Sequence, residues 1–220
     1  MLDKSSWGLF WNKVGRGEYD IKKFYQYIDN IPKDKSKIQA HLKELSKQDP
    51  DIDEEYKYIL LQAGAFGGKQ IWKEGREWKN TSFRSYWQPT AISKRRSPVN
   101  PMMPMPDTIK ERMEIIVAKC KGLTGLHFDI WEFLEYIRFR STENSIFYID
   151  PPYKNTTQYG FTFDWEEWIS CLFDETLAPI YVSECKQYSD EAYQLNFSGA
   201  KGGISGEKKS KNEEWLNIFI

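Results

Sequence analysis

The sequence predicts an α/β fold, with a mostly parallel sheet covered by helices on both faces. From residue 108 onward, segments with apolar residues at helical spacing alternate with short apolar runs that are typical of buried strands. One such run, residues 145–149, leads directly into Asp150 and two prolines. At 220 residues the chain is long enough for one core and an insertion, so we expect a single folding unit.

The second half of the chain has the most regular pattern. We expect helices at residues 108–121, 130–138 and 165–177, and strands at 126–128, 145–149, 180–182 and 215–220, the last of these being one of a pair. The sequence assigns residues 1–30 and 107–220 to this core and residues 31–106 to an insertion.

The first half of the chain is less regular. Residues 1–27 read as the end of a strand, a turn and a helix, and residues 33–58 as a charged, half-exposed helix. Residues 66–96 are aromatic and basic. Four prolines within residues 98–106 predict an extended connector.

The composition of the chain limits the kinds of partner and cofactor that we expect. The 31 basic and 32 acidic residues nearly cancel, so a nucleic-acid surface has to be a local patch. The three cysteines form no C-x-x-C pair, and His41 and His127 have no metal-ligand spacing, so we expect no metal. Asp3 and Lys4 interrupt any signal peptide, and no apolar run approaches the roughly 18 residues of a membrane span. These features predict a soluble protein of a reducing cytoplasm, without a membrane partner.

The turn after residues 145–149 is the strongest candidate site. Ligands of open α/β sheets collect beyond the carboxyl ends of the strands, where Asp150 is expected. Pro151 and Pro152 remove two backbone donors, which leaves the carbonyls of Asp150 and Pro151 as acceptors. Tyr153 adds a flat ring beside them.

Acceptors beside a flat ring suit the alkylation of an exocyclic amine on a planar base. The acceptors hold the amine hydrogens and stabilise the positive charge that develops on nitrogen. Tyr153 stacks on the base, which has to be flipped out of a duplex first. The alternative is a proline-stiffened turn after a buried strand, with no chemistry.

The chain resembles the D12-class, Dam-like family of DNA adenine-N6 methyltransferases. Asp150-Pro151-Pro152-Tyr153 is the specific part of the resemblance. Weaker matches follow in the family's order: Met1-Leu2-Asp3, residues 62–84 with Gly64, Gly67, Gly68, Gly75, Asn80 and Arg84, Phe128-Asp129, residues 180–184, and residues 213–216.

This resemblance implies a Rossmann-like methyltransferase sheet and S-adenosylmethionine as cofactor. Asp150, Pro151, Pro152 and Tyr153 would be catalytic, and Asp3, Asp129 and Asp150 would contact the cofactor. Asp129 is equally well explained as a helix N-cap, and the two roles are compatible.

The chain departs from the family at its start. The family's glycine-bearing cofactor turn does not precede Asp3, so we expect a sheet truncated at its N-terminal strand. Three explanations are open: a companion chain supplies the turn, the chain is truncated, or the protein has lost catalysis. Residues 63–69 are a less favoured substitute for the turn. We expect the chain alone to bind S-adenosylmethionine weakly.

The DNA-facing candidate is the inserted region. Between Phe66 and Arg96, basic residues alternate with aromatic ones, as phosphate contacts and base contacts require. The proposed DNA contacts are Lys69, Lys73, Arg76, Lys79, Arg84, Lys94, Arg95 and Arg96. The alternative is a solvated basic face over ordinary aromatic packing. A second basic patch, residues 201–211, is either a loop beside the site or a flexible hairpin.

The sequence thus predicts a site-specific methyltransferase that acts on adenine N6 of double-stranded DNA in a bacterial or phage-infected cell. The alternative is a catalytically incomplete homologue that binds DNA or protein, or one half of a split enzyme. Methylation of RNA or of a protein amide is a third, less favoured possibility.

Overall fold

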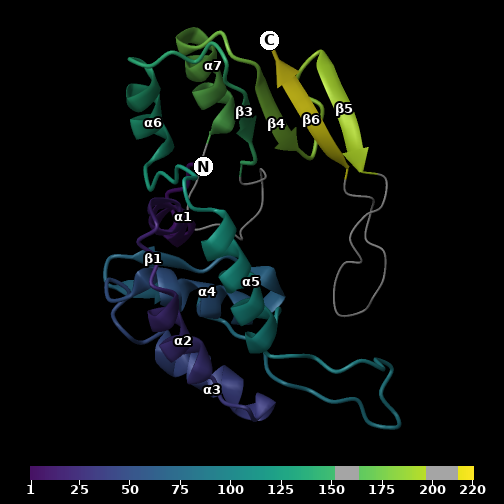
Figure 1. Ribbon diagram of the computed structural model, residues 1–220. Helices are drawn as coiled ribbons and strands as arrows, with labels where there is room; N and C mark the ends of the chain where they lie inside the picture. The colour runs from purple at the N-terminus through teal and green to yellow at the C-terminus, as the bar shows by residue number, and fades with distance from the viewer. Residues whose placement is uncertain (152–163, 197–212) are drawn as a thin grey trace. The chain divides into compact units, whose positions relative to one another are not determined.

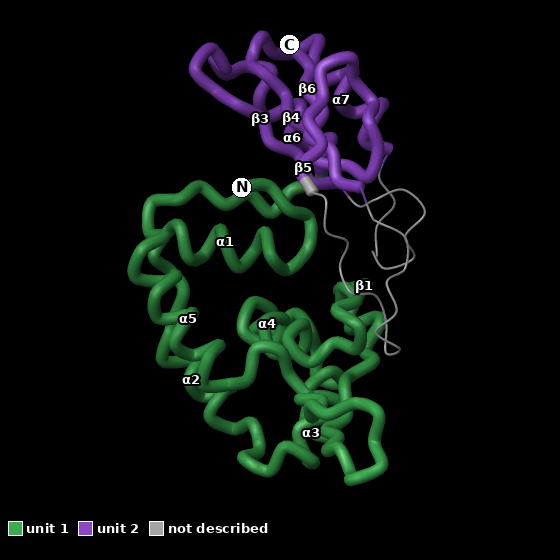
Figure 2. The backbone as a smooth tube through the Cα atoms, turned by 90° about the vertical axis from the view of Figure 1, so that its right-hand side faces the viewer, with its two compact units in different colours: residues 1–129, 158–160 green, residues 130–157, 161–220 purple. Residues whose placement is uncertain are grey.

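The computed structural model describes residues 1–151, 164–196 and 213–220 (Figure 1). Within these residues the chain is α/β, with seven α-helices, a two-stranded sheet and a four-stranded sheet. It packs as two compact units, one of residues Met1–Asp129 and one that begins at Ile130 (Figure 2). Each unit buries its own hydrophobic cluster.

This division differs from the single folding unit and the domain boundaries that the sequence predicts. The sequence assigns residues 1–30 and 107–129 to the core that holds the large sheet. Their helices instead bury apolar side chains against the segment 31–106, so that Phe10, Leu60 and Ile109 share one cluster. Contacts between residues far apart in the sequence determine which segments pack together. The local spacing of apolar residues does not reveal those contacts.

Unit 1 is mainly helical. Side chains at the N-caps, namely Ser5, Asp20 and Asp34, accept hydrogen bonds from the first backbone N–H groups of its first three helices. Its elements are α1 (Ser6–Arg16), α2 (Ile21–Asp29), α3 (Lys35–Leu45), α4 (Glu54–Gly64), the short 3-10 helix η1 (Phe66–Gly68), β1 (Trp72–Glu74), β2 (Glu77–Lys79) and α5 (Pro106–Lys119).

Helix α4 is the centre of unit 1. Every residue of α4 except Gln62 is buried, because α1, α2 and α3 pack around it. Two buried carboxylates, Glu54 and Glu55, start the helix. Ser6 Oγ and Lys73 Nζ donate to Glu54 over 2.7 and 2.8 Å, and Lys13 forms an ion pair with Glu55. These partners make the buried charge tolerable.

Asp53, which precedes α4, links this unit's stability to pH. Burial raises the pKa of Asp53, but hydrogen bonds from Lys23 and Tyr27 outweigh it, so the net pKa is lowered. A lowered carboxyl pKa gives stability above the unfolded value, about 3.9, that is lost as pH falls through the folded pKa. Asp53→Asn should therefore flatten this acid-induced loss. Urea midpoints at pH 7 and pH 3 measure it, and an unchanged difference between them would contradict the assignment.

The start of the chain pairs with the segment after α5. Leu2 and Leu126 form an isolated parallel bridge, in which Asp3 N donates to Leu126 O over 3.1 Å. The strand predicted at residues 126–128 is thus reduced to a single bridge. Glycines of α1 allow this close approach, and Gly122 N donates to Gly15 O over 2.8 Å.

Gly15→Ala should destabilise unit 1 by about 2–3 kcal/mol, although alanine favours a helix interior by about 1 kcal/mol. A Cβ at Gly15 would lie 1.7 Å from the backbone oxygen of Leu123, which cannot move without breaking the packing. Gly67→Ala is the control, because no atom lies within 4 Å and only its φ of 68° opposes a side chain. Chemical denaturation compares the two, and equal losses would contradict the steric explanation.

Unit 2 contains a mixed sheet and two helices. Its elements are α6 (Ile130–Ile137), β3 (Phe147–Ile149), α7 (Trp165–Glu175), β4 (Ile180–Glu184), β5 (Glu191–Asn196) and β6 (Glu214–Phe219). The strand order is β3-β4-β6-β5, with β3 parallel to β4, and β6 antiparallel to both β4 and β5. Ile180 and Val182 of β4 pack in one cluster with side chains of α6 and α7.

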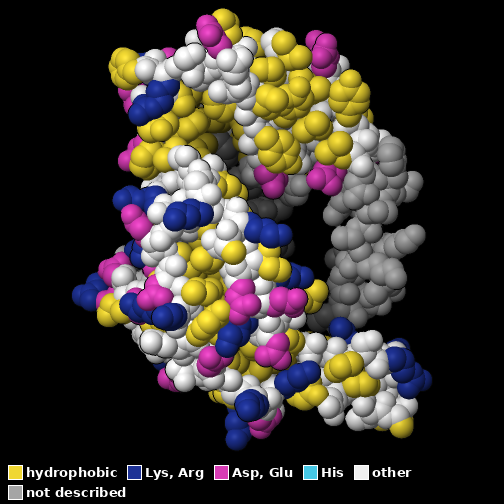
Figure 3. All heavy atoms as spheres, viewed as in Figure 1, with side chains coloured by type: hydrophobic (Ala, Val, Ile, Leu, Met, Phe, Trp, Pro, Cys, Tyr) yellow, Lys and Arg dark blue, Asp and Glu magenta, His cyan; other side chains and the backbone are white. Residues whose placement is uncertain are grey.

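The opposite face of this sheet is not covered by a helix of unit 2 within the described residues. Tyr181 alternates with the buried Ile180 and Val182, and Tyr148 pairs with it in register. Tyr148 is 62 % exposed and Tyr193 is 65 % exposed. Figure 3 shows hydrophobic side chains gathered over these strands. The expected cover by helices on both faces is therefore found on one face only.

Candidate functional site

Three carboxylates meet at one end of the large sheet, and we call Asp150, Glu184 and Glu214 the carboxylate site. Asp150 directly follows the last residue of β3, and Glu184 is the last residue of β4. Ile149 pairs with Val182 in the parallel register, so both strands end at the same edge. Glu214 begins the antiparallel strand β6 and therefore lies at that edge too.

The predicted catalytic turn begins at this edge. Asp150 is exposed, whereas Pro151 is buried. Pro152 and Tyr153 lie outside the described residues. Asp150 therefore lies directly beyond the carboxyl end of β3, an edge strand of the sheet that runs parallel to β4.

Glu184 is the least solvated member of the carboxylate site. Its side chain is 0 % exposed. Oε2 accepts the backbone N–H of Cys185 over 2.8 Å, and buried Oε1 has no hydrogen-bond partner among the described residues. Ser183, the preceding residue, donates to Glu214 Oε1 over 3.5 Å.

The carboxylates influence one another. Although Asp150 is exposed as a residue, lost hydration of its carboxyl group raises its pKa, and the charges of Glu214 and Glu184 add to this rise. Burial also raises the pKa of the Cys185 thiol, as does its interaction with the Glu184 carboxylate. The site is therefore rich in negative charge and in acceptor atoms.

Asn217 fixes the chain that leaves β4. This buried side chain accepts from the backbone N–H groups of Tyr188 and Ser189 over 2.6 and 3.2 Å, and donates to Lys186 O over 3.1 Å. The sequence analysis includes Glu184 and Glu214 only within the weakly matching segments 180–184 and 213–216, and it assigns no role to Asn217. The signal that could have identified these residues is the presence of polar side chains inside otherwise apolar strands.

The predicted cofactor residues divide between the two units. Asp3 and Asp129 belong to unit 1, where Asp3 follows the bridge residue Leu2, and Asp150 belongs to unit 2. Asp3 Oδ1 accepts the N–H of Ser5 over 2.7 Å, and Asp129 Oδ2 pairs with Lys4 Nζ at 2.6 Å. A carboxylate accepts hydrogen bonds from hydroxyl and amine donors.

Three of the predicted DNA contacts are engaged in ion pairs. Lys73 lies 2.8 Å from both Asp51 and Glu54, so its charge belongs to the network of α4. The Arg76 guanidinium pairs with Asp49, and Lys79 pairs with Glu77 at 2.5 Å.

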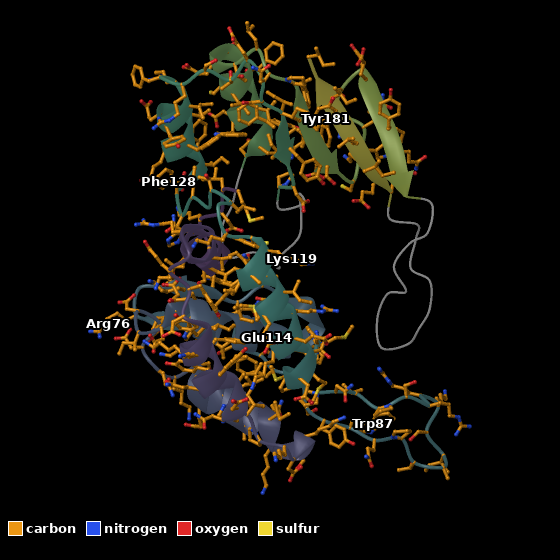
Figure 4. All side chains as sticks on the ribbon, in the orientation of Figure 1. Arg76, Trp87, Glu114, Lys119, Phe128 and Tyr181 are labelled. Carbon is orange, nitrogen blue, oxygen red and sulfur yellow. The ribbon has the colours of Figure 1, made fainter. Side chains whose placement is uncertain are left out.

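The other five basic residues, Lys69, Arg84, Lys94, Arg95 and Arg96, form no salt bridge with any described residue. Lys94, Arg95 and Arg96 are exposed on a loop whose two sides pair at Trp87 and Val99. Figure 4 labels Arg76, which is ion-paired, and Trp87, which begins the loop.

The aromatic residues of the same region divide similarly. Trp78 and Phe83 are 5 % and 3 % exposed and belong to the core of unit 1. Phe66 and Trp87 are exposed. The mixed basic and aromatic composition therefore includes ordinary core packing together with an accessible basic loop.

Within the described ranges, no group of three or more His, Cys, Asp or Glu side chains is placed to hold a metal ion. No helix among them is long and apolar enough to cross a membrane. No protein-family model and no curated protein matches the chain.

Proposed function

We propose that this chain is a DNA adenine-N6 methyltransferase of the Dam-like kind, built on a Rossmann-like sheet, with Asp150 and Pro151 as acceptors for the target amine. The observation that carries the proposal is the position of Asp150. It is exposed immediately beyond β3, at the edge where the parallel strands β3 and β4 end. Ligands of α/β sheets bind at such edges.

The chemistry follows from the acceptors. The amine lone pair of adenine is delocalised into the ring, so nitrogen attacks only as it becomes tetrahedral. The Asp150 carboxylate accepts one amine hydrogen, stabilises the developing positive charge and takes the proton that nitrogen loses. The raised pKa of Asp150, caused first by lost hydration, makes it a better proton acceptor.

S-adenosylmethionine would supply an electrophilic methyl group. Asp3 and Asp129 are the proposed contacts for its ribose and adenine, because carboxylates accept from hydroxyl and amine donors. Ser5 N–H donates to Asp3 Oδ1, and Lys4 Nζ pairs with Asp129 Oδ2. Acceptor carboxylates fit these parts of the cofactor.

Transfer of labelled methyl groups tests the proposal. The purified chain is incubated with labelled S-adenosylmethionine and unmethylated duplex DNA of mixed sequence, and label in N6-methyladenine is counted. Asp150→Ala should lower the rate at least a hundredfold. Asp190→Ala, which removes an exposed carboxylate elsewhere in unit 2, is the control. Absence of label with wild type, or transfer that survives Asp150→Ala, would refute the proposal.

Double-stranded DNA is the proposed partner of the basic loop. Changing Lys94, Arg95 and Arg96 together to Gln should weaken DNA binding and lower the slope of log affinity against log salt by about 2–3, since each phosphate contact contributes about 0.9. Arg76→Gln is the matched control, because Asp49 already pairs with that guanidinium. An unchanged slope in the triple variant would remove the loop from the DNA surface.

A second candidate function is one half of a split methyltransferase. The exposed aromatic side chains on the uncovered sheet face favour it, because exposed apolar patches commonly mark interaction sites. The proposed companion chain would place a helix against Tyr148 and Tyr181 and bring the cofactor turn. Under this reading, extract of the native cell restores label transfer to wild type but not to Tyr148→Lys/Tyr181→Lys. Equal restoration of both would exclude it.

A further inference from the structure

Glu184 is an unusual group to bury. Its side chain is 0 % exposed, and Oε1 is buried without a hydrogen-bond partner among the described residues. Leaving a buried acceptor unpaired costs about 1–3 kcal/mol, and more when it is charged. Buried carboxylates in unit 1 have such partners: Glu54 receives Ser6 and Lys73. Glu54 thus has the donors that Glu184 Oε1 lacks.

The surroundings of Glu184 supply acceptors and few donors. Oε2 takes the Cys185 N–H, and the Cys185 thiol, a weak donor, interacts with the same carboxylate. The carboxylates of Asp150 and Glu214 lie nearby, and the charge of Lys186, two residues along the chain, acts on the adjacent Cys185 thiol. No hydrogen bond joins Lys186 to Oε1, and ionised carboxylates cannot donate, so a ligand N–H is a donor that this unpaired acceptor would take.

We infer that Glu184 Oε1 accepts a hydrogen bond from an N–H group of the ligand held at the ends of β3 and β4, and thereby selects a 6-amino purine over a 6-oxo purine. This inference rests on the proposed function and names a residue of the same site. Asp150 and Glu184 end neighbouring parallel strands, and the charge of Glu184 acts on Asp150.

The selectivity follows from counting donors. The 6-amino group of adenine has two hydrogens, one for each carboxylate, and so satisfies both acceptors. The 6-oxo group of hypoxanthine offers lone pairs only, so it repels both carboxylates, and the single N1–H of hypoxanthine can satisfy at most one of them. Sites built for a hydrogen-bonding group reject an analogue that lacks it far more strongly than apolar pockets reject a changed shape.

The probes are adenosine and inosine, titrated into the full chain at neutral pH with binding followed by ligand-observed NMR. Wild type should bind adenosine at least tenfold more tightly than inosine. Glu184→Gln keeps the shape but can donate as well as accept, so the ratio should fall to within about threefold of one. Glu191→Gln, an exposed glutamate on β5, is the control and should keep the wild-type ratio. Circular dichroism checks that the variants fold.

Several results would overturn the inference: no binding of either nucleoside to wild type, a preference for inosine, as a protonated carboxyl would give, or a ratio that Glu184→Gln leaves unchanged. If Glu184→Gln does not fold, Glu184→Asp, which keeps the acceptor but withdraws it, should also reduce the ratio. Binding needs no methyl donor, so its outcome is separate from label transfer. A lost ratio without transfer supports Glu184 and refutes the methyltransferase, whereas Asp150-dependent transfer with an unchanged ratio refutes Glu184 alone.

Discussion

Leu60→Ala should lower the free energy of unfolding of unit 1 by about 3–4 kcal/mol and leave unit 2 nearly unchanged. Leu60 is 0 % exposed in the middle of α4, where α1, α2 and α3 surround it. Removal of a buried leucine side chain loses its transfer free energy and leaves a cavity, which together cost about 2–5 kcal/mol. The close packing around α4 resists collapse into that cavity, which favours the middle of this range.

Leu172→Ala is the reciprocal change. Leu172 is equally buried in the cluster of unit 2, so its loss should destabilise that unit by a similar amount. Hydrogen exchange measured on peptides of each unit separates the two effects. Leu177→Ala, at a position that is 98 % exposed, is the control. If either core variant lowers protection equally throughout the chain, the two cores unfold as one.

Lys13→Ala should destabilise unit 1 by about 2–3 kcal/mol, because it leaves the Glu55 carboxylate buried without its ion-pair partner. Glu55 is 4 % exposed at its side chain, whereas Lys13 is 35 % exposed. Breaking a fully buried pair costs about 3–5 kcal/mol, and the partial exposure of Lys13 reduces that figure. Most of this loss is the cost of leaving the Glu55 carboxylate buried and unpaired. The attraction between Lys13 and Glu55 contributes less.

A double-mutant cycle tests this explanation. In the Lys13→Ala/Glu55→Gln variant no charge is left unpaired, so the double variant should be more stable than Lys13→Ala alone. Lys47→Ala is the matched control, because its pair with Glu44 is 69 % and 70 % exposed and should contribute less than about 1 kcal/mol. Urea unfolding of wild type, Lys13→Ala, Glu55→Gln and the double variant gives the four values of the cycle, and strict additivity would contradict a coupled buried pair.

The local parts of the fold could be predicted from the sequence. The predicted helices at residues 108–121, 130–138 and 165–177 correspond to α5, α6 and α7 within a few residues. The run that ends before Asp150 forms β3, and residues 180–182 lie in β4. These elements are encoded by periodicity and length, which need only neighbouring residues.

Helix α4 shows why the rest could not be predicted. Glu54, Glu55 and Lys57 are charged, so a reading of local pattern places them in solvent, yet all three are buried. Their partners, among them Lys13 and Lys73, come from distant parts of the chain.

The ion pairs of the basic region and the grouping of the carboxylate site could not be predicted from the sequence for the same reason. The sequence predicts Arg76 as a DNA phosphate contact, but its guanidinium forms an ion pair with Asp49. Glu184 and Glu214 are brought together with Asp150 only by the pairing of β4 with β3 and β6. A single sequence does not encode such pairings in its local pattern.

The one-sided cover of the large sheet has a consequence for how freely its residues can change. Side chains at Ile180 and Val182 touch a close-packed interior, where one methyl group more or less is felt. Tyr148 and Tyr193 face outward, so the volume of the side chain there is nearly unconstrained. Its polarity is constrained, because the phenol hydroxyl keeps an aromatic surface compatible with water. Residues on the two faces of the sheet should therefore tolerate substitution by opposite criteria, volume at Ile180 and Val182 and polarity at Tyr148 and Tyr193.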